Sequence, residues 1–170
     1  VDRALTEVQR DDPLPLVLIG VERSMAQFEE VSENKSHITA RITGAHDRAK
    51  PHEIGALTWE VMRERLRQRR AQVVQELADA IGTKRAVTGI DEAWQLGRTG
   101  SGRLLIVEED YRAEPAREVD GHLVFDGEGD DVMDDPVDEL IEHVVRTGGA
   151  IEFVASGALE EYAHIGLILR

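Results

Sequence analysis

The sequence has no cysteine and no long apolar run. The lack of cysteine excludes disulfide frameworks, zinc ribbons and thiol nucleophiles, and it suits a reducing compartment. No apolar stretch approaches the roughly 18 residues that a membrane-spanning helix needs. No signal peptide opens the chain, so we expect a cytoplasmic protein without a membrane contact. The first residue is Val1 rather than methionine, which is compatible with a fragment of a longer protein.

Charge is abundant but unevenly distributed. The net charge of −14 argues against a broad basic surface for nucleic acid. Residues 120–135 hold seven acidic side chains and no lysine or arginine, whereas residues 60–70 hold five arginines and two glutamates. We interpret the basic stretch as forming salt bridges within the protein. A contact with RNA or with an acidic partner is the alternative.

Strand and helix patterns alternate along the chain. Short apolar runs predict buried strands at residues 14–19, 104–107, 151–155 and 165–169. Apolar residues at helical spacing, together with capping and glycine signals, predict helices at about 1–9, 21–31, 57–81, 90–96 and 136–147. Such alternation predicts an α/β fold, a three-layer α/β/α sandwich with a mostly parallel mixed sheet, from about residue 53 to the end.

Two segments carry little hydrophobic patterning. Residues 32–55 are polar and hold Pro51, and we expect a linker or a boundary there. Residues 110–135 are charged and rich in glycine, apart from a short apolar island at 122–125. We expect a surface insertion near 112–135 that contains one edge strand.

Several phrases in the second half occur in a familiar order. Residues 88–93 (TGIDEA) and 102–110 (GRLLIVEED) resemble the helix-then-strand signature of the third domain of class-1 release factors and Pelota. Residues 137–154 look like the helix, glycine turn and strand that follow in that domain, and residues 164–170 (HIGLILR) are similar to its final strand. The chain therefore resembles the bacterial archaeo-eukaryotic release factor family.

The resemblance extends upstream and implies a domain organisation. Residues 13–22 (PLPLVLIGVE) resemble the end of the preceding domain in the bacterial branch. We therefore expect residues 1–52 to be the C-terminal part of that α/β domain plus a linker, and residues 53–170 to be the third domain. The peptide-releasing Gly-Gly-Gln tripeptide is missing, since Ala150 follows Gly148 and Gly149. The decoding domain is missing too, so we do not expect this chain to hydrolyse peptidyl-tRNA.

The third-domain fold is also that of small ribosomal proteins that bind kink-turn RNA. Their binding loop has an asparagine and a lysine where this sequence has Asp91 and Gln95. A carboxylate repels phosphates, and the ammonium group that would neutralise one is lost. We therefore do not expect specific kink-turn binding.

Two glycine-rich segments imitate ligand loops. Residues 97–103 (GRTGSGR) follow a predicted helix and precede a strand, which is the reverse of a phosphate loop, so we interpret them as a turn. Residues 126–131 (DGEGDD) imitate a calcium loop, but the EF-hand positions for glycine and for the bidentate glutamate hold Asp131 and Val137. We interpret that segment as a solvated acidic loop.

Other chemistry-bearing residues have simpler interpretations. The six histidines show no spacing typical of metal ligands. Ser156 lacks the second glycine of a nucleophile elbow, so we expect a cap or a turn there. We expect Trp59 and Trp94 to be core residues. The sequence predicts no catalytic residue, no cofactor and no metal ion.

Two charged groups are the candidate partner-binding residues. Arg63, Arg67 and Arg70 share one helical edge, where they either pair with Glu60, Glu64 and the acidic insertion or dock rRNA, tRNA or an acidic partner. Glu108, Glu109 and Asp110 follow the buried strand at 104–107.

We expect a non-enzymatic domain of a release-factor-like, translation-linked protein that docks a protein partner or the ribosome. The alternative is a hydrolase or a nucleotide-dependent enzyme with a site at the carboxyl ends of the strands, near Glu108 to Asp110 and Ser156. A third possibility is a fold that serves only assembly. The oligomeric state is left open.

Overall fold

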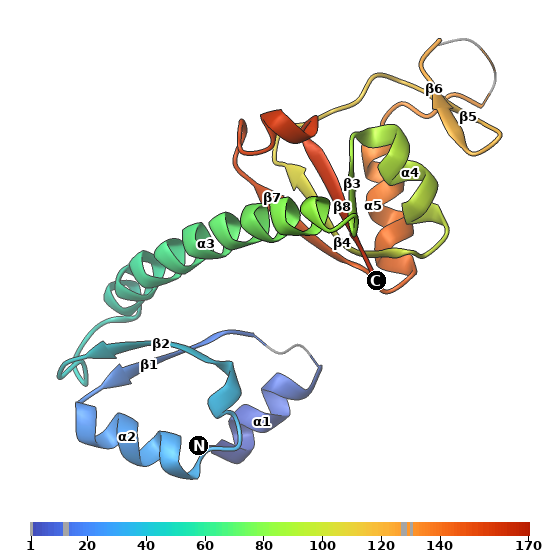
Figure 1. Ribbon diagram of the computed structural model, residues 1–170. Coiled ribbons are helices and arrows are strands. Elements are labelled where there is room, and N and C mark those ends of the chain that lie inside the picture. Colours follow the sequence, from blue (N-terminus) through green and yellow to red (C-terminus); the bar gives the residue numbers. More distant parts are fainter. Residues whose placement is uncertain (1, 12–13, 127–128, 130) are drawn as a thin grey trace. The chain divides into compact units, whose positions relative to one another are not determined.

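The computed structural model describes residues 2–11, 14–126, 129 and 131–170 (Figure 1). The chain divides into two compact units, Val1–Arg67 and Gln68–Arg170. The long helix α3 (Pro51–Gly82) contributes its first half to one unit and its second half to the other. The predicted boundary at residues 52 and 53 falls at the beginning of this helix. Among the described residues, no helix combines the length and the apolar character needed to cross a membrane.

The first unit is built around two parallel strands. Its elements before α3 are α1 (Asp2–Asp11), β1 (Leu16–Gly20), α2 (Glu22–Val31), the 3-10 turn η1 (Lys35–His37) and β2 (Ile38–Thr43). β1 pairs with β2 along its length. The Asp2 carboxylate accepts hydrogen bonds from the Ser32 hydroxyl at 2.6 Å and from the Asn34 amide at 3.0 Å, which joins α1 to the end of α2. These hydrogen bonds, that of Ser32 first, lower the pKa of Asp2.

The linker expected at residues 32–55 was wrong in part, because β2 lies inside it. Residues 38–43 alternate β-branched side chains with others, a pattern typical of a strand that is only half buried. The polar residues on both sides hide this short alternation in the sequence.

The second unit has a four-stranded sheet with the order β3-β8-β4-β7. After α3 the elements are β3 (Ala86–Thr88), α4 (Ile90–Arg98), β4 (Gly102–Glu108), β5 (Arg117–Val119), β6 (His122–Val124), α5 (Pro136–Arg146), β7 (Ala150–Val154), the 3-10 turn η2 (Glu160–Tyr162) and β8 (Ile165–Leu169). β4 is parallel to β7, whereas β8 is antiparallel to both β3 and β4. Three strands therefore run in one direction, as expected for a mostly parallel mixed sheet. β8 runs the other way because its connection from β7 is too short for a helical crossover.

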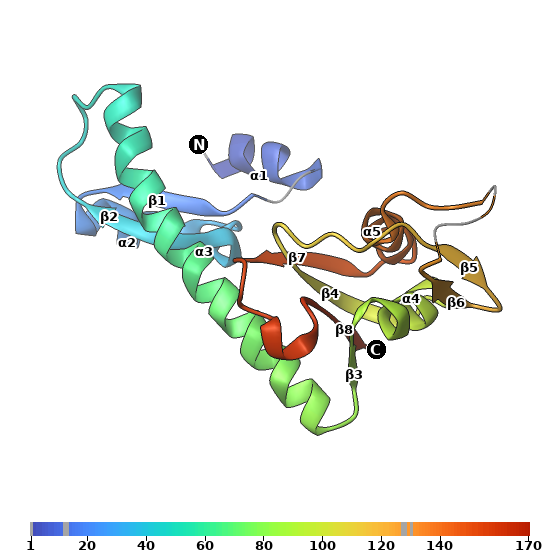
Figure 2. The same cartoon turned by 90° about the horizontal axis from the view of Figure 1, so that it is seen from above.

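The predicted three layers are confirmed, and Figures 1 and 2 show one on each side of the sheet. Alternate residues of β4 enter two separate hydrophobic clusters. Leu104 and Ile106 pack with Leu77 of α3, whereas Leu105 and Val107 pack against α4 and α5. Gly166 of β8 is required by this packing, since a Cβ atom there would lie 2.6 Å from Leu77.

The expected insertion contains a hairpin rather than one edge strand. β5 and β6 pair antiparallel through a two-residue turn at Asp120 and Gly121. Both residues have positive φ, 52° and 87°, which defines the turn type that favours Asp-Gly in hairpins. The Asp-Gly dipeptide was therefore a sequence signal for a second strand. The acidic segment 126–131 includes residues 127–128 and 130, which lie outside the described residues.

The helix α3 is longer than predicted and differs in burial between its halves. It begins at Pro51, which is favourable at the first position of a helix, instead of near Leu57. Trp59, expected in the core, is 62% exposed, whereas Trp94 of α4 is 2% exposed. The expectation for Trp59 was wrong, because helical spacing alone does not show where a helix has no neighbour to pack against.

Candidate partner-binding site at the end of β4

The three consecutive acids at the end of β4 have different environments. Glu108 is 4% exposed, whereas Glu109 and Asp110 are exposed. Strand alternation explains the difference, because Glu108 continues the set of Leu104 and Ile106 on the face covered by α3. Glu109 and Asp110 lie beyond the paired part of the strand, where the chain turns away from the sheet.

Glu108 is the organising residue of this region. Its Oε1 accepts a hydrogen bond from the backbone amide of Leu159 at 2.6 Å, and its Oε2 lies 2.9 Å from Nδ1 of His164. Because a carboxylate can only accept, the ring nitrogen of His164 donates. Burial disfavours the charge of Glu108, but these hydrogen bonds outweigh burial and hold its pKa below the usual value.

The segment that Glu108 anchors has a strained backbone. Ala163 and His164 both adopt left-handed conformations, with φ of 56° and 66°. Each such non-glycine residue costs about 1–2 kcal/mol. The ring of Tyr111 stacks on His164 with 5.4 Å between the centroids. The buried carboxylate and the stacked ring thus hold the turn that leads into β8.

Glu109 and the arginines of α3 form ion pairs. Arg70 pairs with Glu109, Arg63 with Glu60 at 2.7 Å and Arg67 with Glu64 at 3.2 Å. The structure therefore brings together Arg70 and Glu109 of the predicted site residues. Arg63 and Arg67 belong to the first unit, and their partners lie one helical turn away on α3.

Two open hollows lie beside the acidic end of β4. One, of about 100 Å³, includes Asp110, Asp138 and Ile141 of α5, and Phe153 of β7 in its lining. The other, of about 360 Å³, is lined by Glu108, Asp110, Tyr111, Arg112, Ser156 and His164. Sequence reasoning missed Phe153 and Ile141. The signal for Phe153 was its position beside charged Glu152 in a strand, which is typical of a strand at the edge of a sheet.

The residue at the kink-turn register has a structural partner. Oδ1 of Asp91 accepts a hydrogen bond from the amide of Leu123 at 2.8 Å, and its Oδ2 lies 3.1 Å from Nδ1 of His122. Burial raises the pKa of Asp91, but these hydrogen bonds lower it further and leave it below the usual value. Asp91 thereby fastens the β5–β6 hairpin over the start of α4, where the kink-turn loop would present its asparagine.

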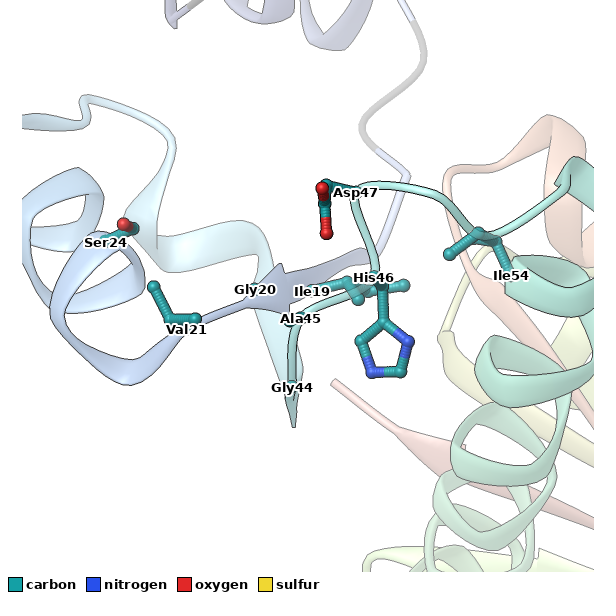
Figure 3. A pocket seen from close by; sticks show the side chains of 9 residues that line it. All are labelled: Ile19, Gly20, Val21, Ser24, Gly44, Ala45, His46, Asp47 and Ile54. Carbon is teal, nitrogen blue, oxygen red and sulfur yellow. The ribbon is translucent and has the colours of Figure 1, made fainter.

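The first unit has a hollow of its own, of about 480 Å³, shown in Figure 3. It lies at the carboxyl ends of β1 and β2 and the start of α2. Its polar side chains include Ser24, His46 and Asp47. The sequence did not single out this place, because its residues come from segments about 25 residues apart that only strand pairing brings together.

The remaining candidate motifs have structural roles. Residues 97–103 form the turn between α4 and β4, in which the Thr99 hydroxyl donates to the carbonyl of Leu96 at 2.8 Å. Ser156 follows β7 and lines the larger hollow. Within the part of the chain that the structure describes, no three histidine or acidic side chains form a group that could hold a metal ion.

The second unit has the fold of the C-terminal domain of archaeal release factors and of Pelota. The C-terminal domain of a peptide chain release factor from Methanosarcina mazei matches with a TM-score of 0.55 and 19% identity, over 69% of this chain and 91% of that chain. The chain belongs to the bacterial archaeo-eukaryotic release factor family 3, whose model matches residues 1–101.

Longer structures match almost the whole chain. Archaeal Pelota, from a model of ribosome-bound Pelota and ABCE1, has a TM-score of 0.64 and 17% identity, over 99% of this chain and 47% of that one. Dom34 of S. cerevisiae, a translation termination-like factor interacting with Hbs1, has a TM-score of 0.54 and 13% identity, over 99% and 51%. This chain thus spans about half the length of those proteins. A search of curated proteins found no match.

Proposed function

We propose that this chain is a non-enzymatic docking part of a translation-linked protein, which acts through a protein partner and the ribosome. The observation that carries the proposal is membership of the release factor family combined with a Pelota-like fold over 99% of the chain. The sequence lacks the Gly-Gly-Gln tripeptide, so the proposed role is termination, rescue or a ribosome-associated stress response without peptide release. In this proposal residues 1–52 complete the preceding domain, and residues 53–170 are the docking domain.

The geometry of the acidic end of β4 supports docking rather than catalysis. Glu108 is committed to two structural hydrogen bonds, and Glu109 is held by Arg70. Asp110 is exposed beside two open hollows, and within the described residues it has neither a hydrogen bond nor an ion pair. Exposed charge beside shallow, open hollows is typical of a surface that meets another macromolecule.

Co-sedimentation tests the proposal. An epitope-tagged full-length protein is followed through sucrose gradients of lysates from growing cells and from cells in which translation is arrested. We expect the protein in the ribosomal fractions, with enrichment on arrested ribosomes, and its release by high salt. Absence from those fractions in both lysates would remove the translation-linked function. A cytoplasmic enzyme of similar size serves as the control for trapping.

A hydrolase is the second candidate, and one observation favours it. The larger hollow brings Ser156 to the same lining as the His164–Glu108 pair, in which a carboxylate orients an imidazole as in hydrolases. A thermal-shift screen with nucleotides, divalent ions and small phosphates discriminates the two functions. A bound substrate or cofactor raises the melting temperature of an enzyme by mass action, whereas a docking domain shows no shift.

A further inference from the structure

The outer strand of the sheet has a free backbone edge. β7 is last in the order β3-β8-β4-β7, and within the second unit its only strand partner is β4. The carbonyl of Val154 accepts a hydrogen bond from the amide of Glu109 at 2.9 Å, so the backbone groups of Val154 point towards β4. Because successive residues of a strand point in opposite directions, the amides and carbonyls of Ile151 and Phe153 point away from the sheet.

Apolar side chains lie next to this edge. Phe153 is 46% exposed, and it lines the smaller hollow together with Ile141 of α5. Val145, one helical turn beyond Ile141, is 54% exposed. A long or apolar exposed edge strand is a pairing hazard that proteins usually blunt with charge. Here only Glu152 supplies a charge within β7, and it is held by Arg69 at 2.8 Å.

The rim of the same hollow is acidic. Glu109, Asp110, Asp135 and Asp138 line it, against a single arginine, Arg112. Arg112 pairs with Asp135 at 3.0 Å, but its side chain is 80% exposed, so a competing cation can displace it at little cost. Asp110 and Asp138 have no ion pair or hydrogen-bond partner among the described side chains.

We propose that this edge binds a basic, extended segment of a protein partner, which pairs with β7 as a fifth strand. Backbone hydrogen bonds to Ile151 and Phe153 give the register, and one apolar side chain of the segment packs on Phe153 and Ile141. Lysine or arginine side chains of the segment meet Asp110 and Asp138. The acidic rim repels RNA, so on a ribosome this contact is with protein. The inference rests on the proposed docking function and specifies its partner.

The test uses full-length protein and a labelled probe peptide of alternating valine and lysine, roughly eight residues long, which is sufficient for one strand. Fluorescence anisotropy at low salt is expected to show binding that weakens about tenfold at high salt. An alternating valine–glutamate peptide is the control and is expected not to bind. Hydrogen exchange should slow at the amides of Ile151 and Phe153, because the amide of Val154 is already bonded to β4.

A matched pair of variants tests the surface. The double variant Asp110→Lys, Asp138→Lys is expected to weaken peptide binding at least about tenfold. The control Glu92→Lys, Glu161→Lys changes the net charge equally at exposed sites elsewhere and is expected to bind within about twofold of wild type. Ile151→Pro removes one outward amide without removing a bond to β4, and it should also abolish binding. Should the proline variant unfold, the charge variants still decide the question.

Several results would overturn the inference. They are equal binding by both double variants, no binding of the valine–lysine peptide, or slowed exchange at sites other than β7. A dimer in light scattering that is lost in Ile151→Pro would identify a second copy as the occupant instead. Ribosome co-sedimentation separates the two proposals. If wild type and Asp110→Lys, Asp138→Lys co-sediment equally, the docking function stands and this surface is rejected. If wild type does not co-sediment, the docking function itself is rejected, whatever the peptide does.

Discussion

At the scale of single residues, position relative to the end of a strand decides what an acidic side chain does. Glu108 and Glu109 are neighbours of the same type, but the first is buried and the second is half exposed. Strand alternation places Glu108 among apolar residues, where an ionised carboxylate is tolerated only with hydrogen-bond donors. Leu159 and His164 supply them.

The substitution Glu108→Gln tests this role. The amide keeps the shape of the side chain but turns an NH₂ group towards either the Leu159 amide or the donating nitrogen of His164. One buried donor then faces another, so the free energy of unfolding should fall by about 1–3 kcal/mol in urea titrations. Glu109→Gln removes an exposed ion pair with Arg70 and should change stability by less than about 1 kcal/mol. Equal losses in the two variants would contradict a structural role that is specific to Glu108.

The lowered pKa of Glu108 predicts a pH dependence. Its folded-state pKa lies below the usual value of 4.5, so the folded protein binds this proton more weakly than the unfolded chain does. The stabilisation is therefore fully present above about pH 4.5 and is lost as the pH falls through the folded-state pKa. Urea titrations from pH 7 to pH 3 should show the difference between wild type and Glu108→Gln shrinking with acidity. A constant difference over that range would show that charge is not the cause.

At the scale of elements, the β5–β6 hairpin is attached to the helix α4 by few contacts. Asp91 accepts from the Leu123 amide, and Arg98 of α4 pairs with Glu118 of β5. Leu123 is the hairpin residue that enters the main hydrophobic cluster. A short two-stranded hairpin is marginal by itself, so these attachments determine whether it stays ordered.

The substitution Asp91→Ala should loosen the hairpin without unfolding the second unit. Loss of the acceptor leaves the amide of Leu123 without its hydrogen bond, so we expect its hydrogen exchange to accelerate about tenfold or more. Exchange in β4 and β8 should stay slow. Glu92→Ala is the matched control, because Glu92 is the adjacent exposed acid on α4. If both variants accelerate exchange alike, the attachment depends on helix charge rather than on the Asp91 hydrogen bond.

The sequence was sufficient for elements with strong patterns and insufficient for short ones. The β8 strand was predicted with its observed ends, because five apolar residues follow a turn. The strands β2 and β3 were missed, since each is half buried and carries only a weak alternation. The acids at the end of β4 were found, but Phe153 and Ile141 were not, because the hollow depends on which strand lies at the edge of the sheet. Strand order is a tertiary property that local patterns do not contain.

At the scale of the whole molecule, α3 is the element that both units share. Trp59, Met62 and Leu66 occupy the same helical stripe as Val73 and Leu77, by their spacing. The second half of that stripe is buried against the sheet, whereas Leu66 is 46% exposed and Trp59 is 62% exposed. One continuous apolar pattern therefore covers two different environments, which is why the sequence alone led to a wrong placement of Trp59.

Matched truncations on this stripe test that difference. Leu77 is fully buried and packs against Gly166, so Leu77→Ala leaves a cavity and should lower the free energy of unfolding by about 2–5 kcal/mol. Leu66→Ala removes an exposed side chain and should cost less than about 1 kcal/mol. Urea unfolding followed by Trp94 fluorescence in a Trp59→Phe background reports on the second unit, because Trp94 lies in its core. A cost for Leu66→Ala as large as that for Leu77→Ala would mean that the first half of α3 is covered in solution, and the stripe would then be core along its whole length.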